Sequence, residues 1–143
     1  MTTRGGADRF QWTGGYSDGA RADGAATLKQ WVAAHGESGL DLIGHSHGAN
    51  VMLLATASGM KAGKLVLSSC PVHADTYFPD FNNCTTVHSV RVKLDRVILA
   101  DGGGQKFEDR RIKENVLPIW FNHNATHDPA VWTKYSISRK IKL

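Results

Sequence analysis

The feature that most constrains the fold is a short turn, Gly44-His45-Ser46-His47-Gly48, set between two apolar segments. Residues 40–43 before it form a compact apolar run, which is typical of a strand buried on both faces. Residues 49–58 after it carry apolar side chains on almost every side, which indicates a buried helix. The sequence therefore predicts a strand, a sharp turn and a helix in immediate succession.

Segments of strand or helix character recur along the rest of the chain. Apolar spacing of three and four residues predicts a helix from about residue 20 to 35, and Pro129 is placed to open a short helix near Trp132. Apolar runs of strand length occupy residues 65–67, 97–100 and 116–121, residues 86–92 alternate like a strand, and residues 10–13 look like a short strand. Strands that alternate with helices form a parallel sheet, so we expect an α/β fold with about five mostly parallel strands and flanking helices. The length suits a single domain over residues 1–143.

The turn matches the pattern G-x-S-x-G, and its position between a strand and a helix makes that match specific. A turn this sharp forces Ser46 into a strained backbone conformation and lifts its Oγ clear of the sheet. Side chains at positions 44 and 48 would collide with the neighbouring strand and helix, so we expect both to require glycine. Ser46 is then a candidate nucleophile, and the backbone N–H of His47 can donate to an oxyanion. The alternative is a serine that only caps the helix.

A serine hydroxyl needs a base to become a good nucleophile, and that base is usually a histidine oriented by a carboxylate. Asp95 follows the run at residues 86–92, and His123 follows the run at residues 116–121. Active-site residues lie beyond the carboxyl ends of parallel strands, so both positions are on the correct edge. The chain order serine, acid, histidine is also the order expected after such a turn. We therefore expect Asp95 to orient His123.

Two further residues compete for these roles. Asp101 ends the run at residues 97–100 and is the alternative acid. His127 is the alternative base, although its place beside Asp128 and Pro129 also suits a residue that caps the last helix or lines the pocket. The order of residues along the chain leaves both alternatives open.

The two histidines within the turn more naturally line the pocket than act as the base. The pair His45-x-His47 matches the first half of the metal-ligand pattern H-x-H-x-D-H. The aspartate and histidine that this pattern next requires are replaced by Ala49 and Asn50. We therefore expect neither a metal nor a cofactor, and we assign His45 and His47 to the pocket and the oxyanion site.

The sequence LIGHSHGAN at residues 42–50 resembles the nucleophile elbow of lipase- and esterase-like α/β hydrolases. The sequence HNATHDP at residues 123–129 resembles their histidine-bearing loop after the last strand. The resemblance extends from about Phe10 to Trp132. It implies a carboxylic ester hydrolase that acts through an acyl-enzyme, with Ser46, Asp95 and His123 as the triad.

The sequence departs from that family at its beginning. In such enzymes, several strands precede the segment that corresponds to the one beginning at residue 10. A loop among those strands, often with a His-Gly pair, donates the second oxyanion N–H. The printed sequence has no counterpart, so we expect a shortened hydrolase. A catalytically weak or inactive binding module with this fold and an acyltransferase with the same triad are the alternatives. A sheet without its usual first strands exposes an edge, which predicts a homodimer.

The interval between the runs at residues 65–67 and 86–92 is too short for a large helical lid. This favours small, soluble or short-chain esters as the substrates.

The composition narrows the partners and the location. With 41% hydrophobic and 21% charged residues, the chain is an ordinary globular protein. Its basic cluster at residues 139–142 has no interleaved aromatic residues, so nucleic-acid binding is not expected. No apolar run approaches the roughly 18 residues of a membrane span, and residues 1–10 lack a signal-peptide core. We therefore expect a cytoplasmic protein whose Cys70 and Cys84 are buried, unpaired thiols.

Overall fold

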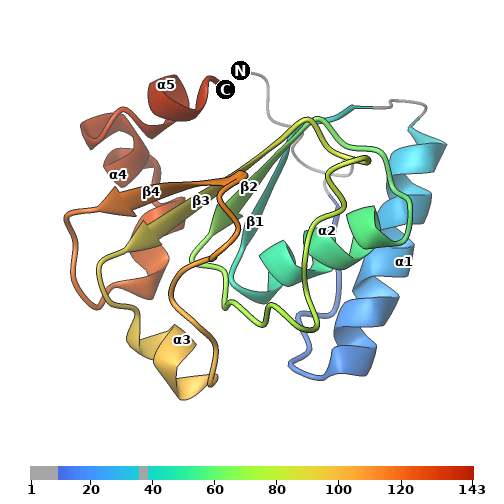
Figure 1. Cartoon of the computed structure of the whole chain (residues 1–143), viewed down its shortest axis with the longest axis horizontal. Coiled ribbons are helices and arrows are strands. Elements are labelled where there is room, and N and C mark those ends of the chain that lie inside the picture. The colour runs from blue at the N-terminus through green and yellow to red at the C-terminus, as the bar shows by residue number, and fades with distance from the viewer. Residues whose placement is uncertain (1–9, 36–38) are drawn as a thin grey trace.

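The computed structural model describes residues 10–35 and 39–143, which build one four-stranded, all-parallel sheet in the order β1-β2-β3-β4 (Figure 1). The strands are β1 (Leu42–His45), β2 (Lys64–Ser68), β3 (Thr86–Val92) and β4 (Ile112–Leu117). The predicted α/β fold with a parallel sheet is confirmed, with one strand fewer than expected. Each carboxyl end lies at the same edge, because all four strands run in the same direction.

Helices cover both faces of the sheet (Figure 1). One face carries α1 (Asp18–Ala34) and α2 (His47–Ala57), and the other carries α4 (Pro129–Lys134) and α5 (Ile137–Ile141). Leu65 and Leu67 of β2 pack into the α1–α2 core, whereas Val66 between them packs with Ile137 and Ile141 of α5. This burial on both faces explains why β2 is an unbroken apolar run.

The long helix α1 forms close to where apolar spacing predicts it. Ser17 caps it, since its Oγ accepts a hydrogen bond from Ala20 N at 3.1 Å. Its buried side includes Ala25, Leu28 and Val32. The predicted helix at Pro129 also forms, with the proline in its first turn.

Residues 10–13 were predicted to form a strand, and this prediction is wrong. They form no regular element and instead pack over the helices. The Phe10 ring lies edge-on to Trp31 with centroids 6.2 Å apart, and a Cβ on Gly24 would lie 3.0 Å from the Trp12 ring. Their apolar side chains therefore contribute to the core without joining the sheet.

Two other predicted strands differ from the structure. Residues 97–100 lie in the helix α3 (Arg96–Ala100), whose N-terminus is capped by Asp95. The last strand lies earlier than the predicted run at residues 116–121, because Pro118 directly after β4 has no N–H to continue the ladder. Short apolar runs fit either helix or strand, and here neighbouring residues decide the outcome.

The first strand, β1, was predicted to be buried on both faces, and this is also wrong. It pairs only with β2 and is an edge strand among the described residues. Leu42 is half-buried and Ile43 is 43% exposed. Homodimer formation through an exposed edge stays a prediction, which sedimentation at micromolar concentration would test.

No helix within residues 10–35 and 39–143 is long and apolar enough to cross a membrane. Residues 1–9, which belong to the segment used to judge the signal peptide, lie outside the described residues. Cys70 and Cys84 are buried free thiols, and burial raises the pKa of both.

Candidate active site

The turn between β1 and α2 places Ser46 at the carboxyl edge of the sheet. Ser46 has φ 53° and ψ −130°, a conformation that is costly for a residue with a side chain. The turn is held by its backbone, because Ser46 N–H donates to Ser68 O at 2.8 Å and Ser46 O accepts from Ala49 N at 3.0 Å. The Ser46 side chain makes no capping hydrogen bond to α2. The interpretation of Ser46 as a plain helix cap is therefore not supported.

The two glycines of the turn are not equivalent. A Cβ at Gly44 would lie 2.9 Å from the Cα and N atoms of Ala49, which are backbone atoms that cannot move aside. A Cβ at Gly48 would meet only Trp12 Nε1, at an ordinary contact distance of 3.8 Å. The predicted need for glycine is confirmed at position 44 and wrong at position 48.

The predicted acid and base are joined. His123 Nδ1 lies 2.8 Å from Asp95 Oδ2, and the Asp95 side chain is almost fully buried. The other carboxylate oxygen, Oδ1, accepts from Val97 N at 3.0 Å and Ile98 N at 3.3 Å. Because the carboxylate accepts from Nδ1–H, Nε2 of a neutral His123 is left as the unprotonated nitrogen. The N-terminus of α3 therefore fixes the carboxylate, and the carboxylate fixes the imidazole.

Neighbouring strand ends hold His123 beside the serine turn. His45, directly before Ser46, donates from Nε2 to the His123 carbonyl at 3.1 Å, and its ring lies edge-on to His123 with centroids 4.6 Å apart. Ser69 Oγ donates to the same carbonyl at 3.1 Å. Within the described residues no hydrogen bond joins Ser46 Oγ to the His123 ring. Catalytic hydrogen bonds are often long until substrate binds.

The environment of His45 keeps it neutral near pH 7. Burial lowers its pKa from 6.5 to about 4. A neutral ring with its proton on Nε2 matches the hydrogen bond to the His123 carbonyl. His45 therefore packs as a neutral ring against His123 and His127, and its role in lining a pocket stays a prediction.

The alternative base, His127, ends the 3₁₀ helix η2 (His123–His127). Its ring packs edge-on against His45, with centroids 4.2 Å apart. The hydrogen bonds to the Asp95 carboxylate come from His123, Val97 and Ile98, and no described contact joins His127 to it. The structure thus pairs His123, and not His127, with Asp95.

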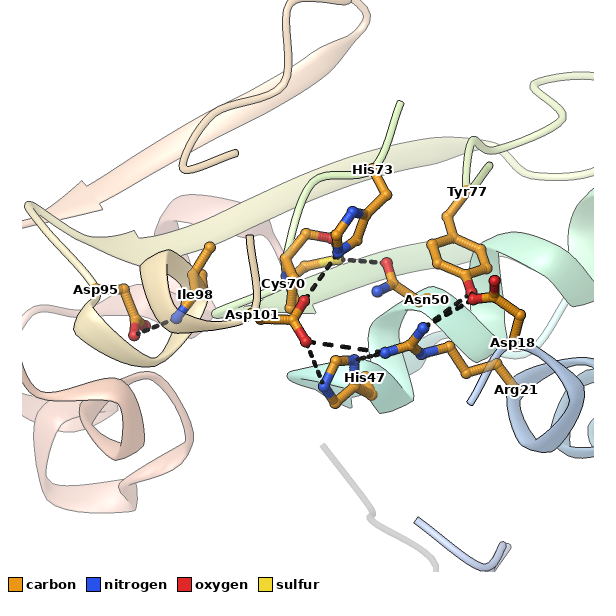
Figure 2. A network of polar contacts seen from close by, with 11 residues as sticks. Asp18, Arg21, His47, Asn50, Cys70, His73, Tyr77, Asp95, Ile98 and Asp101 are labelled. Atoms are coloured by element: carbon orange, nitrogen blue, oxygen red, sulfur yellow. Dashed lines mark hydrogen bonds and ion pairs between the residues drawn. The ribbon is translucent and has the colours of Figure 1, made fainter. Parts of the chain in front are cut away.

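The alternative acid, Asp101, lies at the opposite end of α3 from Asp95 (Figure 2). Its Oδ2 is 2.8 Å from His73 Nε2, and its Oδ1 is 3.3 Å from His47 Nε2. The two candidate acids, Asp95 and Asp101, therefore occupy the N-cap and C-cap positions of one short helix. Asp101 faces His73 and His47, so it does not orient His123.

The turn histidines point to different neighbours. His45 contacts the His123 loop, whereas the buried ring of His47 contacts Asp101 and Arg21 (Figure 2). His47 is the first residue of α2, a position whose backbone N–H has no partner within the helix. That N–H lies directly after Ser46, where an oxyanion donor is needed.

Several site residues escape sequence reasoning. Ser69 has φ 45°, donates its N–H to Val90 O at 2.9 Å, and accepts from Thr126 Oγ1 at 2.9 Å. Its place at the carboxyl end of β2 was a usable signal, because that edge also carries Ser46. Arg21 and His73 carried no such signal, since one lies within a predicted helix and the other in an irregular segment.

Comparisons with known proteins found no match to this chain. No family model matches the sequence, and neither a curated protein nor a solved structure matches it significantly. The chain is an α/β domain with a four-stranded, all-parallel sheet, and its function must be argued from the site itself.

Proposed function

We propose that the protein is a serine hydrolase that cleaves small carboxylic esters, with Ser46 as nucleophile, His123 as base and Asp95 as acid. The observation that carries this proposal is the 2.8 Å hydrogen bond between His123 Nδ1 and the buried carboxylate of Asp95. It lies at the sheet edge that also carries the strained serine. Ser46, Asp95 and His123 follow the chain order that such a triad requires, and His45, directly before Ser46, donates a hydrogen bond to the His123 carbonyl.

The first half of the reaction forms an acyl-enzyme. His123 Nε2 accepts the proton of Ser46 Oγ while Oγ bonds to the ester carbonyl carbon. The carbonyl oxygen becomes an oxyanion, which the backbone N–H of His47 at the start of α2 stabilises. When the intermediate collapses, the bond to the alcohol breaks, and the alcohol leaves with the proton from His123.

The second half releases the acid. Water gives a proton to His123 Nε2 and attacks the acyl carbon, and collapse of the second intermediate returns that proton to Ser46 Oγ. Asp95 keeps its negative charge throughout and stabilises the imidazolium that forms twice in each cycle. No other reagent is required, since ester and water give acid and alcohol.

The loop between β2 and β3 supports small substrates. Residues 69–85 are all described and contain no helix. The loop is tied down by the bridge between Val72 and Gly104 and by the buried Tyr77. An anchored loop without a helix offers no large lid for enclosing a long acyl chain, which favours short-chain esters.

The test combines covalent labelling with turnover. Ser46 and Ser58 flank α2 at its two ends, so Ser46→Ala and the control Ser58→Ala each remove one serine hydroxyl from an end of the same helix. A fluorophosphonate probe should label the wild type and Ser58→Ala but not Ser46→Ala. Hydrolysis of a short-chain nitrophenyl ester should fall by about three orders of magnitude or more in Ser46→Ala and His123→Ala. Labelling that persists in Ser46→Ala would refute the assignment.

A second candidate function is a binding module without turnover. The observation in its favour is that no hydrogen bond joins Ser46 Oγ to the His123 ring among the described residues. In that case the wild type would bind a short-chain ester but would neither label nor hydrolyse it. The same probe therefore separates the two candidates.

A further inference from the structure

We propose that Arg21, His47 and Asp101 form a clamp that holds the backbone N–H of His47 in position to receive the oxyanion. The inference rests on the proposed function, and it assigns positioning roles to three residues outside the triad. The three come from separate elements: Arg21 from α1, His47 from the start of α2 and Asp101 from the end of α3 (Figure 2).

Hydrogen-bond chemistry determines the state of the His47 ring. Arg21 Nη2 lies 2.7 Å from His47 Nδ1, and a guanidinium has donors only. His47 Nδ1 must therefore accept, which places the ring proton on Nε2. Nε2–H then faces Asp101 Oδ1 at 3.3 Å. Both ring nitrogens are thus engaged, and the ring is held from two sides.

The outer partners of the clamp are themselves anchored. Arg21 Nη1 donates to Asp18 Oδ1 and to Tyr77 Oη, both at 3.0 Å, and the Tyr77 hydroxyl also donates to Asp18. Asp101 Oδ2 lies 2.8 Å from His73 Nε2. Arg21 and His47 are both buried. The buried His47 ring, contacted at both of its nitrogens, therefore has little freedom to turn.

The location of the clamp argues for a role beyond stability. A buried charged network is costly to desolvate, and apolar residues of similar size often stabilise a fold as well or better. Here the network is attached to the residue that follows Ser46. The Ser46 side chain itself makes no hydrogen bond to α2, so the His47 ring is the side chain that secures the start of the helix.

The electrostatic surroundings are compatible with a neutral ring. Burial and the positive charge of Arg21 lower the pKa of His47. The nearby His73 and His123 also lower this pKa. Asp101 acts in the opposite direction. An uncharged His47 can accept from Arg21 at Nδ1 while its Nε2–H lies against the Asp101 carboxylate, as the clamp requires.

The kinetic test compares two replacements of His47. His47→Leu removes both contacts and should lower kcat for a short-chain nitrophenyl ester by about 10²-fold, since misplaced catalytic groups cost about that much. KM should change little, because the lost interaction acts in the transition state. His47→Gln keeps one donor and one acceptor and should recover most of the loss. An active wild type with an unaffected His47→Leu variant would overturn the clamp alone.

A matched control separates positioning from general stability. Arg21→Met breaks the clamp, and Arg91→Met breaks another partly buried ion pair, whose Arg91 Nε and Glu114 Oε2 atoms are 2.7 Å apart. At equal concentrations of folded protein, Arg21→Met should lower kcat and Arg91→Met should not. An equal loss in both variants would mean that lost stability explains the effect, and the clamp would be rejected.

An NMR measurement tests the clamp without relying on enzyme activity. ¹⁵N NMR of the His47 ring, in wild type and in Ser46→Ala, should show an unprotonated Nδ1 and a protonated Nε2 at pH 7. The reverse tautomer or a charged ring would overturn the clamp even in an active enzyme. A wild type that shows the expected tautomer but cleaves no ester would instead overturn the proposed function, and with it the catalytic purpose of the clamp.

Discussion

Two histidine–aspartate pairs lie at the two ends of the helix α3. Their nitrogen–oxygen distances are equal, but the other contacts of the two carboxylates differ. His123 Nδ1 lies 2.8 Å from Asp95 Oδ2 at the N-terminus of α3, and His73 Nε2 lies 2.8 Å from Asp101 Oδ2 at its C-terminus. The second oxygen of Asp95 accepts from two backbone N–H groups of α3. The second oxygen of Asp101 faces the His47 ring, with the Arg21 guanidinium 4.0 Å away.

The partners of the second carboxylate oxygen therefore distinguish the two histidine–aspartate pairs. Among the described residues, the His123 imidazole is the only basic side chain within 4.0 Å of the buried Asp95 carboxylate, so the carboxylate charge is available to stabilise an imidazolium on His123. The charge of Asp101 is shared among two imidazoles and a guanidinium. A short histidine–aspartate distance therefore does not identify a catalytic acid by itself.

The largest expected effect sets the two acids against each other. Asp95→Asn should lower kcat by about 10⁴-fold, the loss typical of a triad aspartate, while Asp101→Asn should cost about tenfold or less. Asparagine caps helices as well as aspartate does, so α3 should persist and the melting temperature should change little. Ester hydrolysis by both variants measures the ratio. A larger loss in Asp101→Asn would reverse the comparison.

The serine turn between the two pairs provides the next test. Gly44→Ala should lower the free energy of unfolding by about 1–3 kcal/mol or more, because its Cβ would overlap the Ala49 backbone. Gly48→Ala should be neutral or stabilising by up to about 1 kcal/mol, because alanine favours helix and the site has room. Urea denaturation of the two variants provides the measurement. Equal destabilisation would contradict the steric argument.

A smaller effect is expected at His127, for which no carboxylate contact occurs among the described residues. His127→Ala should lower kcat by about tenfold or less, since its ring packs against His45 and contributes no proton transfer. His123→Ala, assayed in parallel, is the reference for full loss. If His127→Ala abolished turnover and His123→Ala did not, the pairing with Asp95 would be catalytically irrelevant.

The smallest effect is a pH dependence of stability from His45. Burial lowers the pKa of the folded ring from 6.5 to about 4, so between these values the unfolded state binds more protons. The free energy of unfolding should therefore decrease as the pH falls from 6.5 toward 4. His45→Gln should reduce that slope, and His35→Gln at the end of α1 is the control. Thermal melts across this range measure both, and an unchanged slope in His45→Gln would exclude the effect.

Much of the candidate site followed from position along the chain. Asp95 and His123 were predicted because parallel strands end at one edge, and both residues follow a strand there. The nature of residues 97–100 was not predictable, because a short apolar run is compatible with a strand or a helix. The choice matters, since α3 separates Asp101 from His123.

The serine turn is the part of the site that the sequence alone predicts. A Cβ at Gly44 would clash with Ala49 only five residues along the chain, so the requirement for glycine is local, while the hydrogen bond from Ser46 N–H to Ser68 O also holds the turn. The side chains that face this turn come from distant elements, so the packing of those elements selects them. Arg21 meets His47 across 26 residues, and Asp101 meets His47 from the far end of α3. Those meetings depend on how helices pack on the sheet, which residue spacing does not encode.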